Sequence, residues 1–328
     1  MTKPLVSAVI PAYNGERFLR VCIDSALAQT YEPLEVVVVN DGSTDGTAAI
    51  LAEYGDRIRV FHQENAGRSA AKNRAIMESR GEWIALLDQD DLWDPRKVET
   101  QLASAKPGDS VLHSDARVID EAGVVTRNCW VTPGLAPFPQ LADVIRQCPV
   151  LALTAMVRRD AGVAVGGFDE ANKFGTDDWQ LWLALAANHH TFRKVAAILA
   201  SYRIHGDNAS LNRPCMAMGD IYALRQTRLK FRSAFGRQET SEFHRQLHRF
   251  YFDSAWHQYN RCNYRAAAPG FCHAVWHCPL HLQSWLHAVA CIVPFRKTLV
   301  PILRGLFTGR WRDLRRRRAR ISQQRLEG

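Results

Sequence analysis

The chain has 328 residues, 47% of them hydrophobic and 23% charged, which is the composition of a folded globular protein and excludes a disordered or fibrous one. Its length allows one large domain with an appendage. The eight cysteines are scattered without a paired Cys-x-x-Cys pattern, and the N-terminus lacks a secretory pattern. We therefore expect a protein of the reducing cytoplasm.

The formal net charge of +9 lies in the C-terminal tail. Residues 296–328 contain eleven Lys and Arg against two acidic residues, and the rest of the chain is electrically balanced. A nucleic-acid binder would normally carry a second basic stripe, so we expect no nucleic-acid partner. Apolar residues alternate with basic ones along 285–325, which predicts contact with an anionic membrane surface. A solvated, partly disordered tail is the alternative, and no window reaches the ~18 uninterrupted apolar residues of a membrane span.

The first ninety residues alternate short β-rich runs with helical patterns. Strands are predicted over 6–10, 34–39, 58–61 and 83–87, and helices over 18–26, 47–54 and 68–80. This rhythm predicts right-handed βαβ units and a mostly parallel sheet. In such sheets ligands bind beyond the carboxyl ends of the strands.

The later part of the chain has a looser pattern that becomes helical. We predict strands over 110–114, 152–158 and 191–203, a loop over 127–142, and helices beginning at 177 and covering 215–235, 239–260 and 264–277. These predictions divide the chain into an α/β domain at 1–210, a helical extension at 211–295 and the basic tail at 296–328.

A histidine- and cysteine-rich segment near the C-terminus raises the question of zinc. Its members are Cys272, His273, His277, Cys278 and His281. The three histidines recur every four residues, so one helix could align them as metal ligands. Pro279 would disturb that helix, and we therefore favour structural roles.

Polar clusters stand at the predicted carboxyl ends of all four early strands. They are "PAYN" (11–14), "NDG" (40–42), "NAGR" (65–68) and "DQD" (88–90). Asp88, Asp90 and Asp91 would repel one another if all were ionised, and hard cations bind through a few carboxylates plus substrate phosphates. A divalent-cation site is therefore predicted here. A solvated turn leading into a helix start at 91–95 is the alternative.

Six ordered motifs make the chain similar to family-2 glycosyltransferases of the GT-A fold. They are "VIPAYNGERFLRVCIDSALAQTY", "EVVVVNDGSTDGT", "NAGRSAAKNRAI", "WIALLDQDDLW", "GTDDWQLWLAL" and "YRIHGDNAS". The resemblance covers about 1–210, and the last third matches only loosely. It implies a Rossmann-like nucleotide-diphospho-sugar transferase fold, a nucleotide-sugar donor, Mg²⁺ or Mn²⁺, and an inverting single displacement.

The same resemblance implies roles for residues around the donor. It places these side chains at the nucleotide-sugar: Pro11, Tyr13, Asn14, Asp41, Arg68, Lys72, Asp88 and Gln89. Asp41 is expected to hydrogen-bond the base, and Asp88 to hold the ribose hydroxyls or a metal-bound water. Arg68 and Lys72 lie where the family approaches the base and ribose, although both could be surface charges.

The resemblance also implies a metal site and a catalytic base. Asp90, with Asp88 and His205, would hold the cation that bridges the diphosphate. The family more often has Glu-Asp where this chain has Asp177 and Asp178. We assign the base to Asp178 and an acceptor contact to Asp177. The alternative for this pair is helix N-terminal charge.

The function implied is transfer of a sugar from a UDP-, GDP- or dTDP-sugar to a hydroxyl of a glycan or lipid-linked acceptor. A divalent cation would stabilise the leaving diphosphate, and a carboxylate would take the acceptor proton. We expect a role in cell-envelope polysaccharide, lipopolysaccharide or exopolysaccharide synthesis, on the inner face of the plasma membrane. The alternatives are a polyprenyl-phosphate sugar synthase of the same fold, and a non-enzymatic binder of membranes or nucleic acid.

Overall fold

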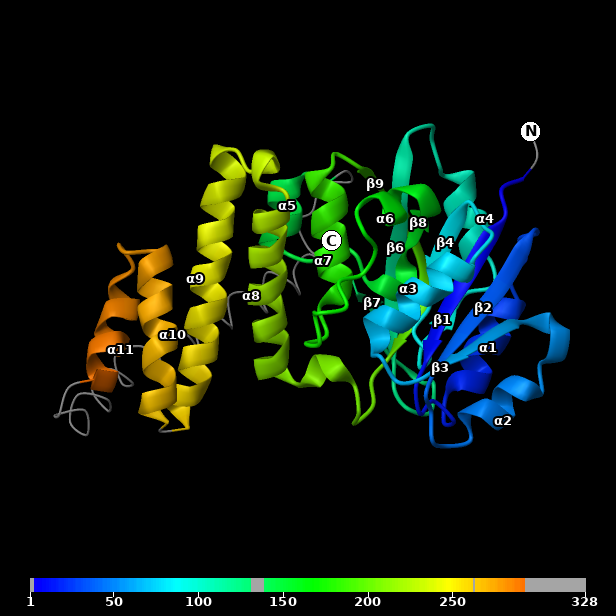
Figure 1. Cartoon of the computed structure of the whole chain (residues 1–328), viewed down its shortest axis with the longest axis horizontal. Coiled ribbons are helices and arrows are strands. Elements are labelled where there is room, and N and C mark those ends of the chain that lie inside the picture. The colour runs from blue at the N-terminus through cyan, green and yellow to red at the C-terminus, as the bar shows by residue number, and fades with distance from the viewer. Residues whose placement is uncertain (1–2, 131–138, 262, 293–328) are drawn as a thin grey trace. The chain divides into compact units, whose positions relative to one another are not determined.

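The computed structural model describes residues 3–130, 139–261 and 263–292 (Figure 1). The chain divides into two compact units, residues 1–239 and residues 240–328, which are described separately below. The boundaries at 210 and 295 remain predictions.

A nine-stranded mixed sheet forms the first unit, in the order β3-β2-β1-β4-β8-β6-β9-β5, with β7 paired to β6. Its strands are β1 (Val6–Ala12), β2 (Leu34–Asp41), β3 (Arg59–Gln63), β4 (Trp83–Leu86), β5 (Leu92–Trp93), β6 (Asp109–Ile119), β7 (Val125–Trp130), β8 (Met156–Arg158) and β9 (Thr191–Arg203). The first four strands pair in parallel, as predicted, and β8 then runs antiparallel to β4. The α/β fold class is confirmed, with a sheet that is parallel in its first half and mixed beyond it.

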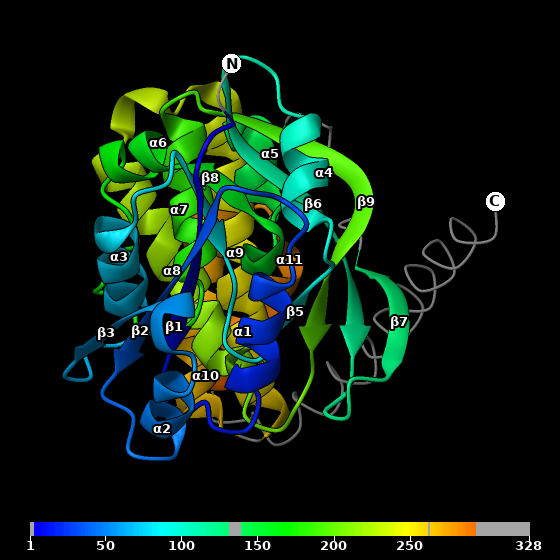
Figure 2. The same ribbon diagram turned by 90° about the vertical axis from the view of Figure 1, so that its right-hand side faces the viewer.

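Helices cover both faces of the parallel strands (Figure 2). Helix α1 (Leu19–Leu27) packs on one face, where its buried residues join the even-numbered side chains of β1, such as Ile10. Helix α3 (Arg68–Glu78) packs on β1 and β2 from the other face. Because both faces are covered, every residue of β1 is buried, which explains the continuous apolar runs in the sequence.

The remaining helices of this unit include those predicted over 47–54, from 177 and over 215–235, and two, over 141–146 and 159–164, that were not predicted. They are α2 (Thr47–Ala52), α4 (Lys97–Ala103), α5 (Leu141–Arg146), α6 (Arg159–Ala164), α7 (Asp177–Ala187) and α8 (Arg213–Lys230). The predicted helix start at 91–95 is wrong in part. Leu92 and Trp93 pair with β9 as strand β5, and α4 begins only after Pro95.

The mixed half of the sheet determines which loops meet. Leu92 pairs with Ser201 and Trp93 with Ala200, so the end of β9 lies beside the segment that precedes β5. As a result, the loop after Arg203 reaches the carboxylates that follow β4. The predicted strand over 152–158 is shorter than expected, because Ala152–Thr154 form a 3-10 turn.

The second unit is helical, as predicted from about residue 240 onward. Its helices are α9 (Arg237–Asn260, which begins at the unit boundary), α10 (Tyr264–His277) and α11 (Leu282–Ile292). Phe252, Tyr259 and Phe271 form the centre of its apolar cluster. Helix α10 ends two residues before Pro279, so His281 does not share a helix with His273 and His277. Within the described ranges no helix is long and apolar enough to cross a membrane.

Candidate active site

Three carboxylates follow strand β4, and the innermost one anchors the others. Asp91 is 1% exposed, and its Oδ1 accepts a hydrogen bond from the backbone N–H of Arg203 at 2.8 Å. The Arg203 side chain returns this contact, because its Nε donates to the carbonyl oxygen of Asp90 at 2.8 Å. The end of β9 is thus fastened to the acidic loop from both sides. Asp91 therefore has a structural role that its position at a helix start did not reveal.

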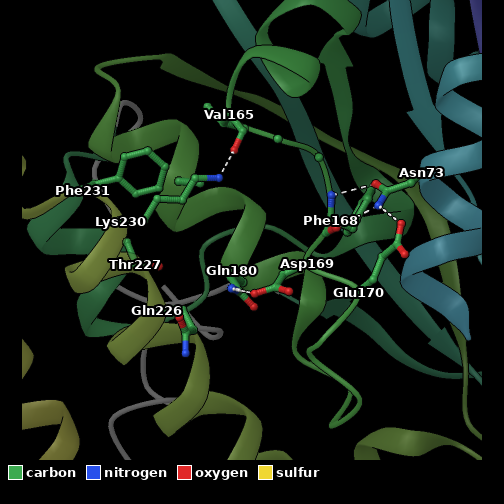
Figure 3. A pocket seen from close by; sticks show the side chains of 13 residues that line it. Asn73, Val165, Phe168, Asp169, Glu170, Gln180, Gln226, Thr227, Lys230 and Phe231 are labelled. Carbon is green, nitrogen blue, oxygen red and sulfur yellow. Dashed lines mark hydrogen bonds between the residues drawn. The ribbon is translucent and has the colours of Figure 1, made fainter.

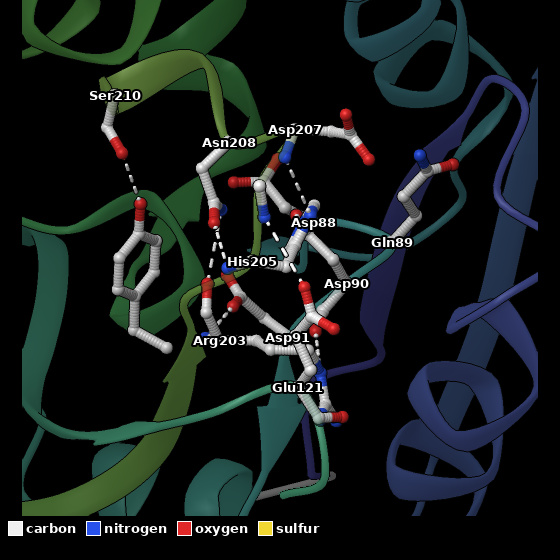
Figure 4. A network of polar contacts seen from close by, with 12 residues as sticks. Asp88, Gln89, Asp90, Asp91, Glu121, Arg203, His205, Asp207, Asn208 and Ser210 are labelled. Atoms are coloured by element: carbon white, nitrogen blue, oxygen red, sulfur yellow. Dashed lines mark hydrogen bonds and ion pairs between the residues drawn. The ribbon is translucent and has the colours of Figure 1, made fainter. Parts of the chain in front are cut away.

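Asp90 and His205 meet in this loop (Figure 4). Asp90 Oδ2 lies 2.8 Å from His205 Nε2, although the two residues are 115 positions apart in the sequence. Burial, and then the charge of Asp88, raise the pKa of the Asp90 carboxyl. The pKa of Asp91 is well above its usual range, because of burial and then its two acidic neighbours. The Oδ2 atom of Asp91 is buried without a hydrogen-bond partner.

The loop after β1 forms a rim next to these carboxylates. Gln89 binds the Tyr13 backbone twice, accepting from its N–H at 2.9 Å and donating to its carbonyl oxygen at 3.0 Å. Asn14 has a positive φ of 47° and accepts from the Thr44 backbone N–H at 2.8 Å, which ties this loop to the one after β2. The Tyr13 ring is 46% exposed and available to a ligand. Pro11 is buried at the end of β1, beneath this rim.

Asp41 is buried at the end of β2 and holds the loop after β3. Its Oδ1 accepts from Gln63 Nε2 at 2.7 Å and from the Ala66 N–H at 2.9 Å. Its Oδ2 accepts from the Gly67 N–H at 2.9 Å. Each carboxylate oxygen has about two acceptor sites, so Oδ2 can accept one more bond. Asp41 therefore shapes the "NAGR" loop.

A buried cation connects the acidic loop after β4 with helix α7. Lys72 of α3 is 3% exposed, and its Nζ lies 3.1 Å from Asp177 Oδ2 and 3.5 Å from Asp88 Oδ1. Arg68, one turn earlier on α3, pairs with the other oxygen of Asp177 at 2.8 Å. Burial alone would lower the pKa of the Lys72 ammonium, but Asp177 and Asp88 raise it overall. Both cations face the acidic site, but only Lys72 is buried, since the Arg68 side chain is 39% exposed.

Asp177 and Asp178 have opposite electrostatic surroundings. Burial would raise the pKa of Asp177, but Lys72 and Arg68 outweigh it and lower that pKa below its usual range. For Asp178, burial and then the Asp177 charge raise the pKa to about 6. The Asp178 side chain is half-buried, and its Oδ1 accepts a hydrogen bond from the Trp179 N–H of its own helix at 2.8 Å. A carboxylate with this pKa is mostly ionised at neutral pH and can accept a proton.

The structure thus brings the sequence-predicted residues into three connected groups. Asp88, Asp90 and His205 form the first group. Tyr13, Asn14 and Gln89 form the rim. Lys72 and Asp177 form the third group, and Lys72 links it to the first. Sequence reasoning missed Arg203, whose guanidinium also lies 4.7 Å from the Phe18 ring centre. Its place within "YRIHGDNAS" was the only signal that could have identified it.

A cavity of about 410 Å³ lies elsewhere in this unit, between α3, α7 and α8 (Figure 3). Its polar side chains bond to one another or to backbone. Asn73 donates to the Phe168 carbonyl oxygen, Gln180 donates to Asp169, and Lys230 donates to the Val165 carbonyl oxygen. None of the sequence-predicted site residues lines it. The acidic cluster therefore defines the candidate active site better than this cavity does.

Residues 7–133 match the family model of glycosyl transferase family 2. An uncharacterized glycosyltransferase of Rickettsia felis is 37% identical over 224 residues, which are 63% of this chain and 35% of that protein. The putative teichuronic acid biosynthesis glycosyltransferase TuaG of Bacillus subtilis is 29% identical over 223 residues, or 64% of this chain and 83% of TuaG. The chain spans between 27% and 58% of the length of the Rickettsia proteins that it matches.

A solved structure of Staphylococcus aureus TarS 1–349 in complex with UDP-GlcNAc has the same fold. It superimposes with a TM-score of 0.68 at 17% sequence identity, covering 92% of this chain and 91% of that one. Together, these similarities identify a nucleotide-sugar transferase fold of the GT-A type. Residues 7–133 thus carry the similarity to glycosyl transferase family 2.

Proposed function

We propose that the protein is an inverting glycosyltransferase that moves a sugar from a nucleotide-diphosphate sugar to an acceptor hydroxyl. The observation that carries this proposal is the arrangement of two acidic sites joined by one buried lysine. Asp88 and Asp90 stand at the carboxyl end of β4, Asp178 lies in the first turn of α7, and Lys72 connects the two regions through Asp88 and Asp177. A donor site and a proton acceptor on opposite sides of one sugar need such a layout.

The donor set fits a divalent cation. Asp88, Asp90 and His205 would hold it, and the partnerless Asp91 Oδ2 lies in the same acidic loop. No three His, Cys, Asp or Glu side chains of the described residues stand ready to hold a metal by themselves. Mg²⁺ and Mn²⁺ typically bind through one or two carboxylates plus substrate phosphates. When bound, such a cation stabilises the negative charge on a leaving diphosphate.

The chain's own residues provide the remaining chemistry. As the acceptor oxygen attacks the anomeric carbon, its proton passes to Asp178, and the bond from the sugar to the nucleoside diphosphate breaks. Attack from the side opposite the leaving group inverts the configuration. Lys72 and Arg68 keep Asp177 ionised, which places Asp177 as a positioning residue at the start of α7 that can also contact the acceptor.

The donor pocket is proposed from the rim residues. Pro11, Tyr13 and Asn14 would form the wall for the nucleotide, with Gln89 fixing the loop of Tyr13. Asp41 Oδ2 would accept a hydrogen bond from the base. A UDP-sugar is the first donor to test, because the similar TarS structure contains UDP-GlcNAc.

The acceptor proposed is a hydroxyl of a cell-envelope glycan or of a lipid-linked precursor. TuaG, the relative named for teichuronic acid biosynthesis, supports this class of acceptor. We further propose that the protein attaches to the inner face of the plasma membrane through 285–325. Residues 293–325 of this segment lie outside the described residues, so the attachment rests on sequence there.

The test is a panel of UDP-, GDP- and dTDP-sugars assayed for donor hydrolysis with Mn²⁺, Mg²⁺ or a chelator. One donor should be hydrolysed only with metal. Asp90→Ala should abolish this activity and weaken nucleoside-diphosphate binding, while the far-ultraviolet circular dichroism spectrum stays unchanged. Wild-type activity of Asp90→Ala in chelator would disprove the metal site. A polyprenyl-phosphate acceptor used in preference to glycans would instead favour the synthase alternative.

A further inference from the structure

The turn between α10 and α11 exposes large apolar side chains. Leu280 is 98% exposed, Trp276 80% and Leu282 70%. Trp285 is 48% exposed, and its indole Nε1 donates to the carbonyl oxygen of Pro279 at 2.8 Å, so its ring lies beside the turn. We call Trp276, Leu280, Leu282 and Trp285 the hairpin tip.

Helix α11 continues this exposed apolar surface away from the hairpin tip. Val289, 47% exposed, follows Trp285 by four residues and so falls on the same side of the helix. Ala288, Ala290 and Cys291 are buried in the apolar cluster of the helical unit. The helix is therefore apolar on its exposed side as well as on its packed side. Exposed apolar surface of this extent indicates an interaction site.

The charge of the surrounding sequence indicates what kind of partner binds there. No Asp or Glu occurs from 254 to 312, whereas Arg261 and Arg265 lie in this stretch and the basic tail begins at Arg296. A surface without carboxylates does not repel anionic lipid headgroups, and nearby Arg and Lys attract them. Tryptophan is enriched at the boundary between headgroups and acyl chains, where its ring is apolar and its N–H stays polar. A second copy of the chain is a less suitable partner, because it would bring an equally basic segment against the first.

We propose that the hairpin tip inserts into the headgroup–acyl boundary of an anionic membrane. This inference rests on the membrane attachment in the proposed function and locates its apolar anchor in the described helices. It predicts two separable contributions to binding. Insertion of the tip is apolar and insensitive to salt, whereas attraction of the basic tail is electrostatic and screened by salt.

The experiment measures binding of the full chain to vesicles. Vesicles of phosphatidylcholine mixed equally with phosphatidylglycerol are compared with vesicles of phosphatidylcholine alone, at low and high salt. Leu280→Ser/Leu282→Ser should reduce the partition coefficient by roughly tenfold or more at both salt concentrations. Both side chains are exposed, so folding should survive. Leu229→Ser, at a leucine of α8 that is 74% exposed, is the matched control and should bind like the wild type.

A second measurement tests insertion directly. Brominated lipid should quench wild-type tryptophan fluorescence, and Trp276→Phe/Trp285→Phe should lose most of that quenching. The proposal is overturned if the double serine variant partitions like the wild type, or if the wild type binds neither vesicle. It is also overturned if the serine substitutions convert a lipid-free dimer to a monomer without changing vesicle binding. Donor hydrolysis without vesicles should be equal in wild type and serine variant. If neither the wild type nor the serine variant hydrolysed a donor, the proposed sugar transfer would be disproved, whereas the proposal of tip insertion would be unaffected.

Discussion

Asp177 and Asp178 are chemically identical neighbours that the fold places in different electrostatic states. Two cations of α3 stabilise the ionised form of Asp177, and that charge in turn disfavours ionisation of Asp178. Pairs of carboxyls whose pKa values are separated in this way are typical of acid–base catalysis. The structure therefore supports Asp178 as the proton acceptor and Asp177 as the residue that positions it.

Asp178→Asn should reduce sugar transfer by roughly 10²–10⁴-fold, because general-base catalysis is lost. Donor affinity should change little, since the proposed donor contacts come from Tyr13, Asp41 and Asp90. In the wild type, the transfer rate should fall as the pH decreases through about 6, where Asp178 takes up a proton. Asp177→Asn is the matched comparison and should act mainly on acceptor binding. Equal loss of donor affinity and rate in Asp178→Asn would instead give this side chain a structural role.

Lys72 is the residue whose role changed most between sequence and structure. The sequence placed it near the base and ribose or on the surface, because position along a helix does not reveal which distant carboxylate it meets. Its partner Asp177 is 105 positions away. Only the tertiary fold, which sets the first residue of α7 beside α3, brings the two together.

Lys72→Met should destabilise the protein by about 3–5 kcal/mol, because it leaves buried Asp177 with one cation fewer. Chemical denaturation of the variant measures this loss. Lys72→Arg should restore part of the stability, and Lys106→Met, at an exposed lysine, should have almost no effect. If Lys72→Met raised the donor KM without loss of stability, the direct donor contact implied by the family resemblance would be favoured.

At the scale of elements, the sequence predicted best where local pattern and packing agree. The four parallel strands follow from short apolar, β-rich runs, and helices α1, α3 and α10 follow from apolar periodicity, because each helix buries one face. Strand β5 was missed because its two residues owe their conformation to pairing with β9, more than a hundred residues away. The closeness of Asp90 and His205 likewise depends on that long-range pairing. It could be expected from family resemblance but not from spacing.

In the helical unit, histidines join α9 to the segment from His277 onward. His244 Nδ1 lies 2.9 Å from His277 Nδ1. His248 and His281 both bond to the Ser284 hydroxyl, at 3.0 and 2.9 Å, with ring centres 4.4 Å apart. Burial, and then His281, lower the pKa of His248 to about 4, and burial lowers that of His281. Within the described part of the chain these histidines serve as packing groups.

Acid should therefore loosen this unit. The unfolded chain binds protons with a histidine pKa near ~6.5 and the folded chain only near 4, so stability is lost as the pH falls between these values. His248 should contribute about 1–2 kcal/mol, reduced by partial solvent screening. Hydrogen exchange of peptides from 240–292 should accelerate from pH 6.5 to 4.5, after correction for intrinsic rates. His248→Gln should weaken this acceleration, and His257→Gln, at an exposed histidine of α9, should not. Equal acceleration in both variants would contradict the role of His248.

At the scale of the whole molecule, the charge distribution separates binding from chemistry. The net charge of +9 equals that of residues 296–328, while the proposed catalytic groups all lie before residue 210. Each basic residue near an anionic surface contributes ~1 kcal/mol, and salt screens this attraction. Deleting 296–328 should therefore weaken sedimentation with anionic vesicles and remove its salt dependence. The salt-insensitive part should persist, because the hairpin tip is retained. Donor hydrolysis should be unchanged, since no proposed donor contact is removed. If the shortened chain still sedimented with anionic vesicles to the same extent and with the same salt dependence, the tail would be excluded as the electrostatic anchor. Residues of the electrically balanced body would then have to supply the electrostatic attraction.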